Sequence, residues 1–310
     1  MKQNIPFFSV VISVFNKAEF ISDTLNSVFT QTFRDYEIII VNDGSTDNSL
    51  EIINSFENPK ITIIDQKNYG AANSRNNGIK QSCAKYVALL DGDDIWKESY
   101  LDEIYHAIST FPEHHVFACA IAHKFGNRIE KVRYANFLKK TQSYNYFRAS
   151  SKHSILSSSS IVFDKGILEK TGYFDETIIS GQDTDLWIRI GLYFEVIFIP
   201  KVLVYYVFDK SSLSNTSFDL KLKPRYDNYR NEEKPNTELS RFLNKNRYSL
   251  AIMSKINSDK KAFNFYNSEI DKGQLNLKEK ILLASPKPVL DLLIWTRKIR
   301  GKKLYYKSLD

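Results

Sequence analysis

The chain has 310 residues, of which 43% are hydrophobic and 25% charged, a composition typical of a globular protein rather than a disordered one. Its two cysteines, Cys83 and Cys119, exclude a disulfide-stabilised scaffold and indicate a reducing compartment. The N-terminus shows no secretory signal, and no apolar run approaches the roughly 18 residues that a membrane-spanning helix requires. We therefore expect a cytoplasmic protein.

The formal charge of +7 is distributed unevenly along the chain. Residues 1–220 carry 22 lysines and arginines against 26 aspartates and glutamates, whereas residues 221–310 carry 21 against 10. A basic segment of this kind favours contact with an anionic partner. The sequence therefore predicts a catalytic region over residues 1–220 and a second region, basic and mainly helical, over residues 221–310.

The first ninety residues alternate between short apolar runs and amphipathic stretches. The runs predicted as buried strands are residues 8–15, 36–41, 61–64 and 86–90, each mostly apolar. The stretches with helical spacing are residues 18–31, 50–53 and 69–81. This alternation predicts an α/β fold with a mostly parallel sheet and helices on both faces.

Polar residues follow three of these strands, at ends that a parallel sheet brings to one edge. Asn16 follows the first strand, Asp43 the second, and the run from Asp91 to Asp94 the fourth. Three crowded carboxylates repel one another, and a divalent cation such as Mg²⁺ or Mn²⁺ would make them tolerable. Gly92 would let the backbone turn sharply and come close to a ligand. The alternative is a solvated acidic turn, which a short acidic motif favours when it stands alone.

Four ordered motifs resemble those of the family 2 glycosyltransferases, which have the GT-A nucleotide-binding fold. The motifs are residues 14–21 (VFNKAEFI), 41–49 (VNDGSTDNS), 68–79 (NYGAANSRNNGI) and 90–94 (LDGDD). The resemblance covers about residues 7–215. It implies an enzyme that moves a sugar, with inversion, from a nucleotide-diphosphate sugar to an acceptor hydroxyl. We expect a UDP-linked donor and a role in a bacterial surface polysaccharide such as capsule or O-antigen.

The resemblance also assigns roles to residues at matching positions. Asp43 corresponds to the carboxylate that reads the nucleotide base, Asp91 to a ribose contact, and Asp93 to the ligand of Mn²⁺ or Mg²⁺. Arg75 either orients the metal-binding loop or touches phosphate; the alternative is a structural ion pair with an aspartate of that loop. The further expected contacts of the nucleotide sugar are Phe15, Asn16, Glu19, Asn68 and Gly92.

The middle of the chain contains the candidate catalytic base. Residues 136–154 are polar and aromatic without a clear period, and we expect them on the acceptor side. Asp183 lies at the start of a predicted helix. Inverting transfer needs a carboxylate that takes the proton of the acceptor hydroxyl, and the family's Glu-Asp motif supplies it. Here Gln182 replaces the Glu, so we expect Asp183 to be the base; the alternative is that Asp183 caps the helix.

A second departure from the family pattern follows the candidate base. Residues 196–207 are predicted as a strand-rich run interrupted at Pro200, and the chain then reaches Asp209. Relatives carry a histidine at this position, where it contacts metal or diphosphate. Asp209 would keep an oxygen ligand for Mg²⁺ or Mn²⁺, so we include it in the expected metal site.

The basic region carries no motif of the family. Helices are expected over residues 239–262, and the apolar run of residues 289–295 precedes five basic residues. These five are Arg297, Lys298, Arg300, Lys302 and Lys303. An apolar run beside a basic cluster resembles a segment that lies on an anionic membrane surface; the alternative is the solvated end of a packed helix. We do not expect nucleic-acid binding. A peripheral position on the inner face of the membrane would suit a lipid-linked saccharide acceptor.

Two other functions remain open from the sequence. A sugar-phosphate nucleotidyltransferase would need a glycine-rich, basic phosphate loop after the first strand, and residues 16–19 do not supply one. A non-catalytic protein that binds nucleotide sugars would explain the departures at Gln182 and Asp209. The sequence does not determine the oligomeric state, the donor sugar or the linkage.

Overall fold

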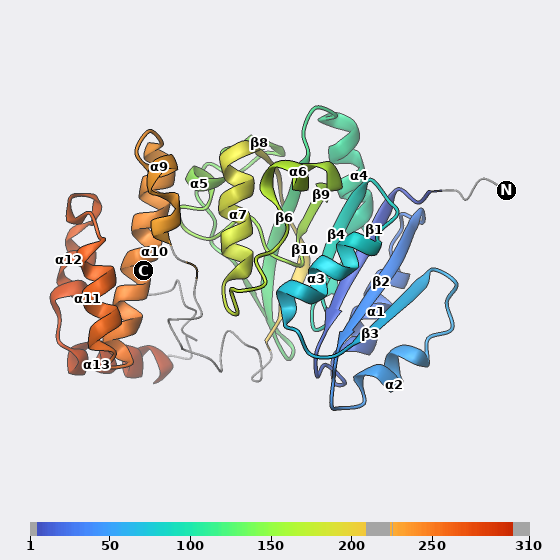
Figure 1. The fold of residues 1–310 in the computed structure, drawn as a ribbon, viewed down its shortest axis with the longest axis horizontal. Helices are drawn as coiled ribbons and strands as arrows, with labels where there is room; N and C mark the ends of the chain where they lie inside the picture. Colours follow the sequence, from blue (N-terminus) through green and yellow to red (C-terminus); the bar gives the residue numbers. More distant parts are fainter. Residues whose placement is uncertain (1–4, 209–223, 225, 300–310) are drawn as a thin grey trace. The chain divides into compact units, whose positions relative to one another are not determined.

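The computed structural model describes residues 5–208, 224 and 226–299, and the chain divides into two compact units, residues 1–216 and 217–310. In the described part of the first unit, ten strands form one sheet (Figure 1). Its order is β3-β2-β1-β4-β9-β6-β10-β5, with β7 beside β6 and β8 beside β10. The α/β class expected from the sequence is confirmed.

The first half of the sheet is parallel. Its strands are β1 (Phe8–Val14), β2 (Tyr36–Asp43), β3 (Ile61–Gln66) and β4 (Tyr86–Asp91), joined by α1 (Ile21–Phe29), α2 (Ser49–Asn54) and α3 (Ala71–Gln81). Their β-branched and leucine side chains fill both faces, so β1, β2 and β4 are almost completely buried. Every strand predicted in this half is present.

The second half of the sheet is mixed. Its strands are β5 (Ile95–Trp96), β6 (Val116–Phe125), β7 (Arg128–Lys131), β8 (Gln142–Tyr144), β9 (Ile161–Asp164) and β10 (Val196–Val207). β9 runs antiparallel to β4 and β6, whereas β6 and β10 are parallel. The expected interruption at Pro200 is present as a register shift between Ile199 and Val202, although β10 continues through it as one strand. Proline has no N–H for the ladder, and the irregularity accommodates it.

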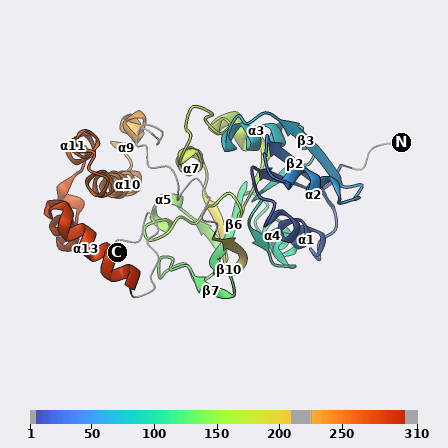
Figure 2. The same cartoon turned by 90° about the horizontal axis from the view of Figure 1, so that it is seen from below.

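Helices cover both faces of this sheet. α3 and α7 (Gln182–Tyr193) lie on one face, whereas α1 and α4 (Tyr100–Thr110) lie on the other (Figure 2). The shorter helices are α5 (Tyr146–Ala149) and α6 (Leu168–Thr171). Gly78 allows α3 to pack closely on the sheet, because a Cβ at this position would lie 2.3 Å from Val11 Cγ1.

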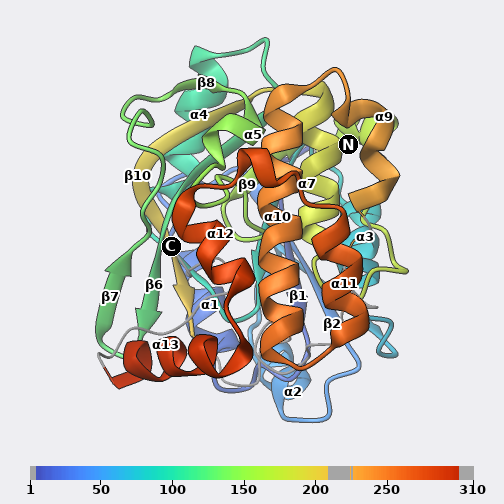
Figure 3. The ribbon, with the colours of Figure 1, turned by 90° about the vertical axis from the view of Figure 1, so that its left-hand side faces the viewer.

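The described part of the second unit is helical, as the sequence predicts (Figure 3). Its helices are α9 (Arg230–Glu233), α10 (Thr237–Ile256), α11 (Lys260–Ser268), α12 (Leu277–Ala284) and α13 (Lys287–Ile299). The other helices pack on α10, whose Arg247 forms a buried ion pair with Glu233 at 2.6 Å. Within the described ranges, no helix combines the length and apolar character needed to cross a membrane. The expected basic cluster lies outside the described residues, apart from the backbone of Arg297 and Lys298.

Candidate active site

The strand order reverses between β1 and β4, because β2 and β3 lie on one side of β1 and β4 lies on the other. Open α/β sheets bind their ligands outside the carboxyl ends of the strands at such a reversal. Here the loop after β1 meets the loop after β4, and Lys17 Nζ contacts Asp93 Oδ2 at 2.6 Å. The structure therefore brings the first and fourth motifs together, as the sequence predicts.

Asn16 connects the loop after β1 to the turn after β2. It has a φ of 51°, a left-handed conformation that asparagine tolerates better than most residues. Its Oδ1 accepts a hydrogen bond from the Thr46 N–H at 2.7 Å, and its own N–H donates to Ser45 Oγ at 3.0 Å. The motifs at residues 14–21 and 41–49 therefore hold each other in place. Asn16, expected to contact the nucleotide sugar, uses its side-chain oxygen for this contact.

Asp43 holds the loop between β3 and α3. Its side chain is almost inaccessible, since the residue is only 3% exposed. One carboxylate oxygen accepts hydrogen bonds from Gln66 Nε2 at 2.8 Å and the Tyr69 N–H at 3.0 Å, and the other accepts from the Gly70 N–H at 2.8 Å. The residue expected to read the base thus has a structural task as well. Phe15, Glu19 and Asn68, the other expected contacts on these loops, are exposed.

The three carboxylates after β4 each have their own compensation. Asp91 accepts a hydrogen bond from Arg75 Nη2 at 2.6 Å, and Asp93 pairs with Lys17. Asp94 is fully buried and accepts from Ser159 Oγ at 2.5 Å and the Val207 N–H at 2.9 Å. Burial, reinforced by the charges of Asp93 and Asp91, raises the pKa of Asp94 well above its ordinary value. The protein itself therefore compensates part of the crowding of these carboxylates, and the expected cation stays a prediction.

Gly92 is required by its neighbours on β1. A Cβ at this position would lie 3.0 Å from Val14 Cγ2 and 3.1 Å from the Ser13 carbonyl oxygen. The Gly92 N–H donates to the same carbonyl at 3.0 Å. Gly92 therefore lets the carboxylate loop lie close against β1, and its expected approach to a ligand stays a prediction.

Arg75 reaches the carboxylate loop from α3. It is 7% exposed, and its guanidinium lies 5.5 Å from the centre of the Phe174 ring. Burial opposes its charged form, but Asp91 and, more weakly, Asp183 hold the pKa of Arg75 above its ordinary value. The ion pair considered from the sequence is present. Nε and Nη1 have no acceptor among the described residues, so Arg75 retains donors for an oxyanion.

Asp183 occupies the second position of α7, whose N-cap is Gly181 with a φ of 88°. The alternative that Asp183 caps this helix is therefore wrong. One carboxylate oxygen of Asp183 accepts from the N–H of the adjacent Thr184 at 2.7 Å. The charge of Asp183 contributes to raising the pKa values of Arg75, Tyr146 and Tyr206, so each of these three groups lies within electrostatic reach of Asp183. Its expected role as the base stays a prediction.

The carboxylates of this site suit a divalent cation that is also bound by a phosphate group of the substrate. The described residues contain no group of three or more acidic, histidine or cysteine side chains arranged to enclose a metal. Mg²⁺ is typically held by one or two carboxylates together with substrate phosphates rather than by a protein cage. Asp93 provides one such carboxylate, with a side chain that is 15% exposed. Asp209, the second expected ligand, lies outside the described residues.

Sequence reasoning missed three residues of this site. They are Lys17, Ser159 and Tyr206. Ser159 also accepts from the Asp91 N–H at 3.2 Å, and the pKa of Tyr206 is raised well above its ordinary value, first by burial and then by the charges of Asp94 and Asp91. Lys17 lies inside the motif at residues 14–21, but a lysine next to a loop is too common to indicate a functional residue. Ser159 and Tyr206 join the site only through the pairing of β9 and β10 with the rest of the sheet.

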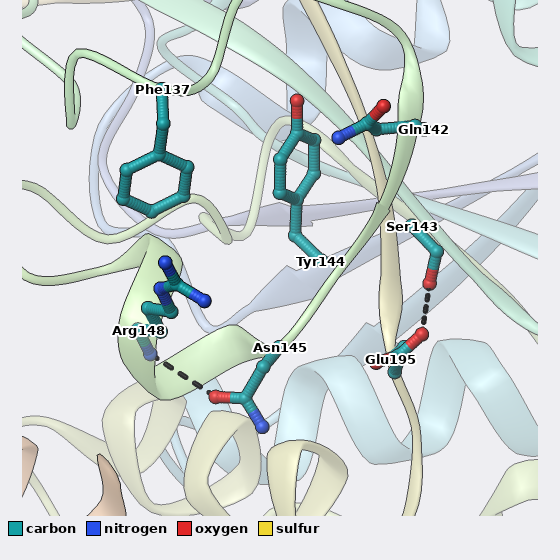
Figure 4. A pocket seen from close by; sticks show the side chains of 7 residues that line it. All are labelled: Phe137, Gln142, Ser143, Tyr144, Asn145, Arg148 and Glu195. Atoms are coloured by element: carbon teal, nitrogen blue, oxygen red, sulfur yellow. Dashed lines mark hydrogen bonds between the residues drawn. The ribbon is translucent and has the colours of Figure 1, made fainter.

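A separate hollow of about 370 Å³ lies at the opposite end of α7. Its lining includes Phe137, Tyr144, Arg148 and Glu195, and Figure 4 shows the hydrogen bond between Ser143 and Glu195. β8 pairs with the first residues of β10, which lie at the amino end of that strand. This part of residues 136–154 is therefore distant from the carboxylate loop. Tyr146 comes nearer to the candidate base, whose charge contributes to raising its pKa.

Comparison with known proteins places the chain in a family. The profile described as "Glycosyl transferase family 2" matches residues 9–172, more than half of the chain. The chain belongs to glycosyl transferase family 2. It is therefore a glycosyltransferase, as the sequence motifs predict. Asp183 lies beyond the matched segment, so its assignment does not rest on the match.

Relatives and solved structures agree with this placement. An uncharacterized glycosyltransferase of Rickettsia prowazekii is 27% identical over 238 residues, which cover 71% of this chain and 70% of the relative. Poly-beta-1,6-N-acetyl-D-glucosamine synthase of Staphylococcus epidermidis is 29% identical over 216 residues, which cover 66% of this chain and 50% of the synthase. The similarity therefore extends over only half of that enzyme.

Crystal structures that resemble this chain include those of TarS from S. aureus. Residues 1–349 of TarS in complex with UDP-GlcNAc give a TM-score of 0.60 at 21% identity, covering 68% of this chain and 61% of that one. A further TarS structure gives a TM-score of 0.65 at 20% identity, covering 89% of this chain and 52% of that one. The shared fold confirms the predicted GT-A architecture.

Proposed function

We propose that this glycosyltransferase moves a sugar from a UDP-sugar to a hydroxyl of a saccharide or lipid-linked saccharide, with inversion, in the synthesis of a bacterial surface polysaccharide. The observation that carries the proposal is the proximity of Asp183 to Arg75. Arg75 is bonded to Asp91 at the reversal of strand order, where nucleotides bind in α/β sheets. A candidate base and a candidate nucleotide edge therefore form one site.

The donor class follows from the proteins that this chain resembles. Solved TarS structures contain UDP and UDP-GlcNAc, and one relative is a poly-N-acetylglucosamine synthase. These support a UDP-linked hexose or N-acetylhexosamine as the donor. The sugar-phosphate nucleotidyltransferase is set aside, because the chain belongs to a glycosyltransferase family. The non-catalytic alternative loses support because a carboxylate remains at position 183, near Arg75.

The reaction divides between the two sides of the site. Asp183 takes the proton of the acceptor hydroxyl as its oxygen bonds to C1 of the sugar, and the bond from C1 to the diphosphate breaks on the opposite face. The electron pair of that bond leaves with UDP. Arg75 places a positive charge near the departing diphosphate. Asp93 would hold the divalent cation, which when bound neutralises negative charge on the diphosphate.

Donor use provides the direct test. We expect purified protein with Mn²⁺ to release UDP from one or more members of a panel of UDP-sugars, faster in the presence of acceptor saccharides. GDP- and CMP-sugars serve as controls for recognition of the nucleotide base. Release from none of the panel, by protein that unfolds cooperatively, would contradict the proposal, and release from a GDP-sugar would contradict its donor class.

The second unit supports a peripheral position on an anionic membrane surface. α12 and α13 expose the large apolar side chains of Leu277, Ile281, Leu292 and Trp295, and the residues that follow are basic. Apolar side chains beside lysines and arginines bind reversibly to anionic lipid surfaces. We expect this surface to bring the enzyme to a lipid-linked acceptor at the cytoplasmic face.

Vesicle sedimentation tests this placement. We expect the protein to bind vesicles that contain anionic lipid, less at high salt, and the double variant Leu292→Ser with Trp295→Ser to bind more weakly. Phe265→Ser is the matched control, because Phe265 is an exposed aromatic residue on α11. Binding that ignores lipid charge, or that the double variant retains in full, would contradict it.

A further inference from the structure

The hollow at the far end of α7 takes no part in the proposed reaction. Its volume of about 370 Å³ falls in the range of small-molecule sites, which is roughly 300 to 1,000 Å³. Its lining comes from the segment of residues 137–148 and from Glu195, the second residue after α7. The rise of an α-helix places this end of α7 roughly 15 Å from Asp183. A ligand held here would therefore lie apart from the reacting groups.

Arg148 brings a positive charge to the hollow. Its backbone N–H donates to Asn145 Oδ1 at 3.1 Å, so the short helix α5 positions the residue. Its guanidinium lies 5.3 Å from the centre of the Phe137 ring, and no group among the described residues accepts a hydrogen bond from it. A planar guanidinium can bind a carboxylate through two parallel hydrogen bonds. The hollow therefore offers a place for a carboxylate of a ligand.

The opposite side of the hollow offers groups that bind hydroxyls. Ser143 and Glu195 lie across the hollow from Arg148, and one carboxylate oxygen of Glu195 accepts a hydrogen bond from Ser143 Oγ (Figure 4). In the described part of the chain, nothing donates to the other oxygen, and the side-chain amide of Gln142 has no hydrogen bond. Glu195 would repel a bare inorganic anion, whereas a hydroxyl group would donate to it. The hollow therefore suits a ligand that carries both hydroxyl groups and an acid.

The segment around the hollow concentrates positive charge in a region that is otherwise acidic. Residues 124–152 contain eight of the 22 lysines and arginines of residues 1–220, but one of the 26 aspartates and glutamates. Among the described residues, one of these cations pairs with that glutamate and the other seven have no ion pair. Lys140 is exposed beside the hollow, where its carbonyl accepts from the Tyr144 hydroxyl at 2.9 Å. Charge of this sign attracts an anionic ligand.

We propose that this hollow binds an acidic saccharide. The carboxylate of a hexuronate residue pairs with Arg148, and the hydroxyl groups of the sugar bond to Gln142 and Glu195. Its C–H groups pack against Phe137, which is 43% exposed. The binding itself does not depend on the proposed reaction. Its use, to hold an acidic acceptor chain while another part of that chain reaches Asp183, rests on the proposed function.

A second contact of this kind acts through effective concentration. An acceptor bound at the hollow presents its reacting end to the active site as an intramolecular ligand, provided that the chain spans the roughly 15 Å between them. Long acidic acceptors should therefore have a lower KM than short ones, with kcat unchanged. An acceptor of a single sugar gains nothing from the hollow.

The test measures saccharide binding directly, on the full chain. Calorimetry and saturation-transfer NMR use tetragalacturonate, with its methyl ester as the matched uncharged ligand. A chelator is present, so that no divalent cation joins the saccharide to the carboxylate loop. Arg148→Met removes the charge in the hollow, whereas Lys131→Met removes an exposed cation on β7, in the same segment but outside the lining. Thermal unfolding shows whether each variant is folded, and UDP release from a donor sugar, measured separately with Mn²⁺, shows whether its active site is intact.

We expect the wild type to bind tetragalacturonate, and Arg148→Met to bind it about tenfold more weakly, the usual effect of losing a charge-assisted hydrogen bond. The methyl ester should bind the wild type more weakly by a similar factor. Lys131→Met should bind tetragalacturonate as the wild type does, because its charge lies outside the hollow. UDP release should be unchanged in both variants.

Several outcomes would overturn this inference. Equal binding of the methyl ester would show that the carboxylate is not recognised, and equal losses in Arg148→Met and Lys131→Met would indicate diffuse attraction rather than a site. Displacement by an equal concentration of inorganic phosphate would indicate a general anion site. If the wild type releases UDP from its donor but binds no tetragalacturonate, this inference alone fails; if it binds the saccharide but uses no donor, the proposed function alone fails.

Discussion

The two halves of the sheet use their carboxylates differently. In the first half, Asp43 is almost inaccessible and accepts three hydrogen bonds from other protein groups. At the start of α7, Asp183 is partly exposed, and the hydrogen bonds recorded for it in the described part of the chain come from Thr184. A carboxylate held by buried N–H groups stabilises a loop, whereas one with free lone pairs can accept a proton.

This difference explains why the first half carries the recognisable motifs. Asn16 and Asp43 accept hydrogen bonds from backbone N–H groups of other loops, so substituting them would remove contacts that hold those loops. The motif residues are therefore constrained by the fold as well as by the ligand. In the second half, the role that we propose for Asp183 needs one carboxylate, and a single residue is a weak pattern in the sequence.

The largest effect that we expect separates cation chemistry from folding. Asp93→Ala should abolish turnover, because the carboxylate that would hold the cation is lost. The protein should still unfold cooperatively, because removing Asp93 also removes its repulsion with Asp94, which offsets part of the lost ion pair with Lys17. Turnover with Mn²⁺ and urea unfolding are measured on the same preparation. Full activity of Asp93→Ala in the presence of a chelator would show that the reaction needs no cation at this position.

The second prediction tests the base. Asp183→Asn should lower kcat by a factor of about 10² to 10⁴, the usual contribution of general-base catalysis. UDP affinity should stay at the wild-type level, because the base that we propose faces the acceptor and not the nucleotide. Calorimetry with UDP and steady-state rates measured together distinguish the two roles. A loss of UDP affinity that parallels the loss of rate would assign Asp183 a structural role and place the base elsewhere.

Most of the first half of the fold could be predicted from the sequence. Continuous apolar runs identified β1 to β4, and the polar residues that follow β1, β2 and β4 do share one edge. Periodicity carries this information because strands buried on both faces and amphipathic helices differ in their pattern. The right-handed connections restrict the order of the parallel strands, but the sequence does not specify which order is adopted.

The contacts that complete the site could not be predicted. Asp94 accepts from the N–H of Val207, which lies 113 positions further along the chain, and Ser159 enters through β9. Neither contact leaves a periodic or local signal, because it depends on how β9 and β10 join the sheet. The compensation of the carboxylates was missed for the same reason. Lys17 balances the charge of Asp93 and Arg75 that of Asp91, and these pairs form only through the tertiary structure.

The third prediction measures the structural task of Asp43. Asp43→Asn should lower the free energy of unfolding by about 2 to 3 kcal/mol, because an amide nitrogen replaces an acceptor that faces backbone N–H groups. Asp183→Asn is the matched control and should change stability by less than about 0.5 kcal/mol. Urea unfolding at neutral pH measures both. Equal stability of the two variants would remove the distinction between a loop-forming and a proton-accepting carboxylate.

The smallest effect concerns acid sensitivity of the second half. His123, on β6, packs against the rings of His153 and Tyr206, and burial lowers its pKa to about 4. The unfolded chain, with a histidine pKa of about 6.5, binds a proton between these pH values that the folded chain does not. Stability from this group is therefore complete above about pH 6.5 and is lost as the pH falls toward 4, by about 2 kcal/mol after allowance for partial exposure.

His123→Leu should show a correspondingly shallower loss in urea unfolding over this range, whereas His106→Gln, at an exposed position on α4, should follow the wild type. If the stability of the wild type and of His123→Leu fell in parallel with pH, protonation of His123 would not be the cause of the acid sensitivity.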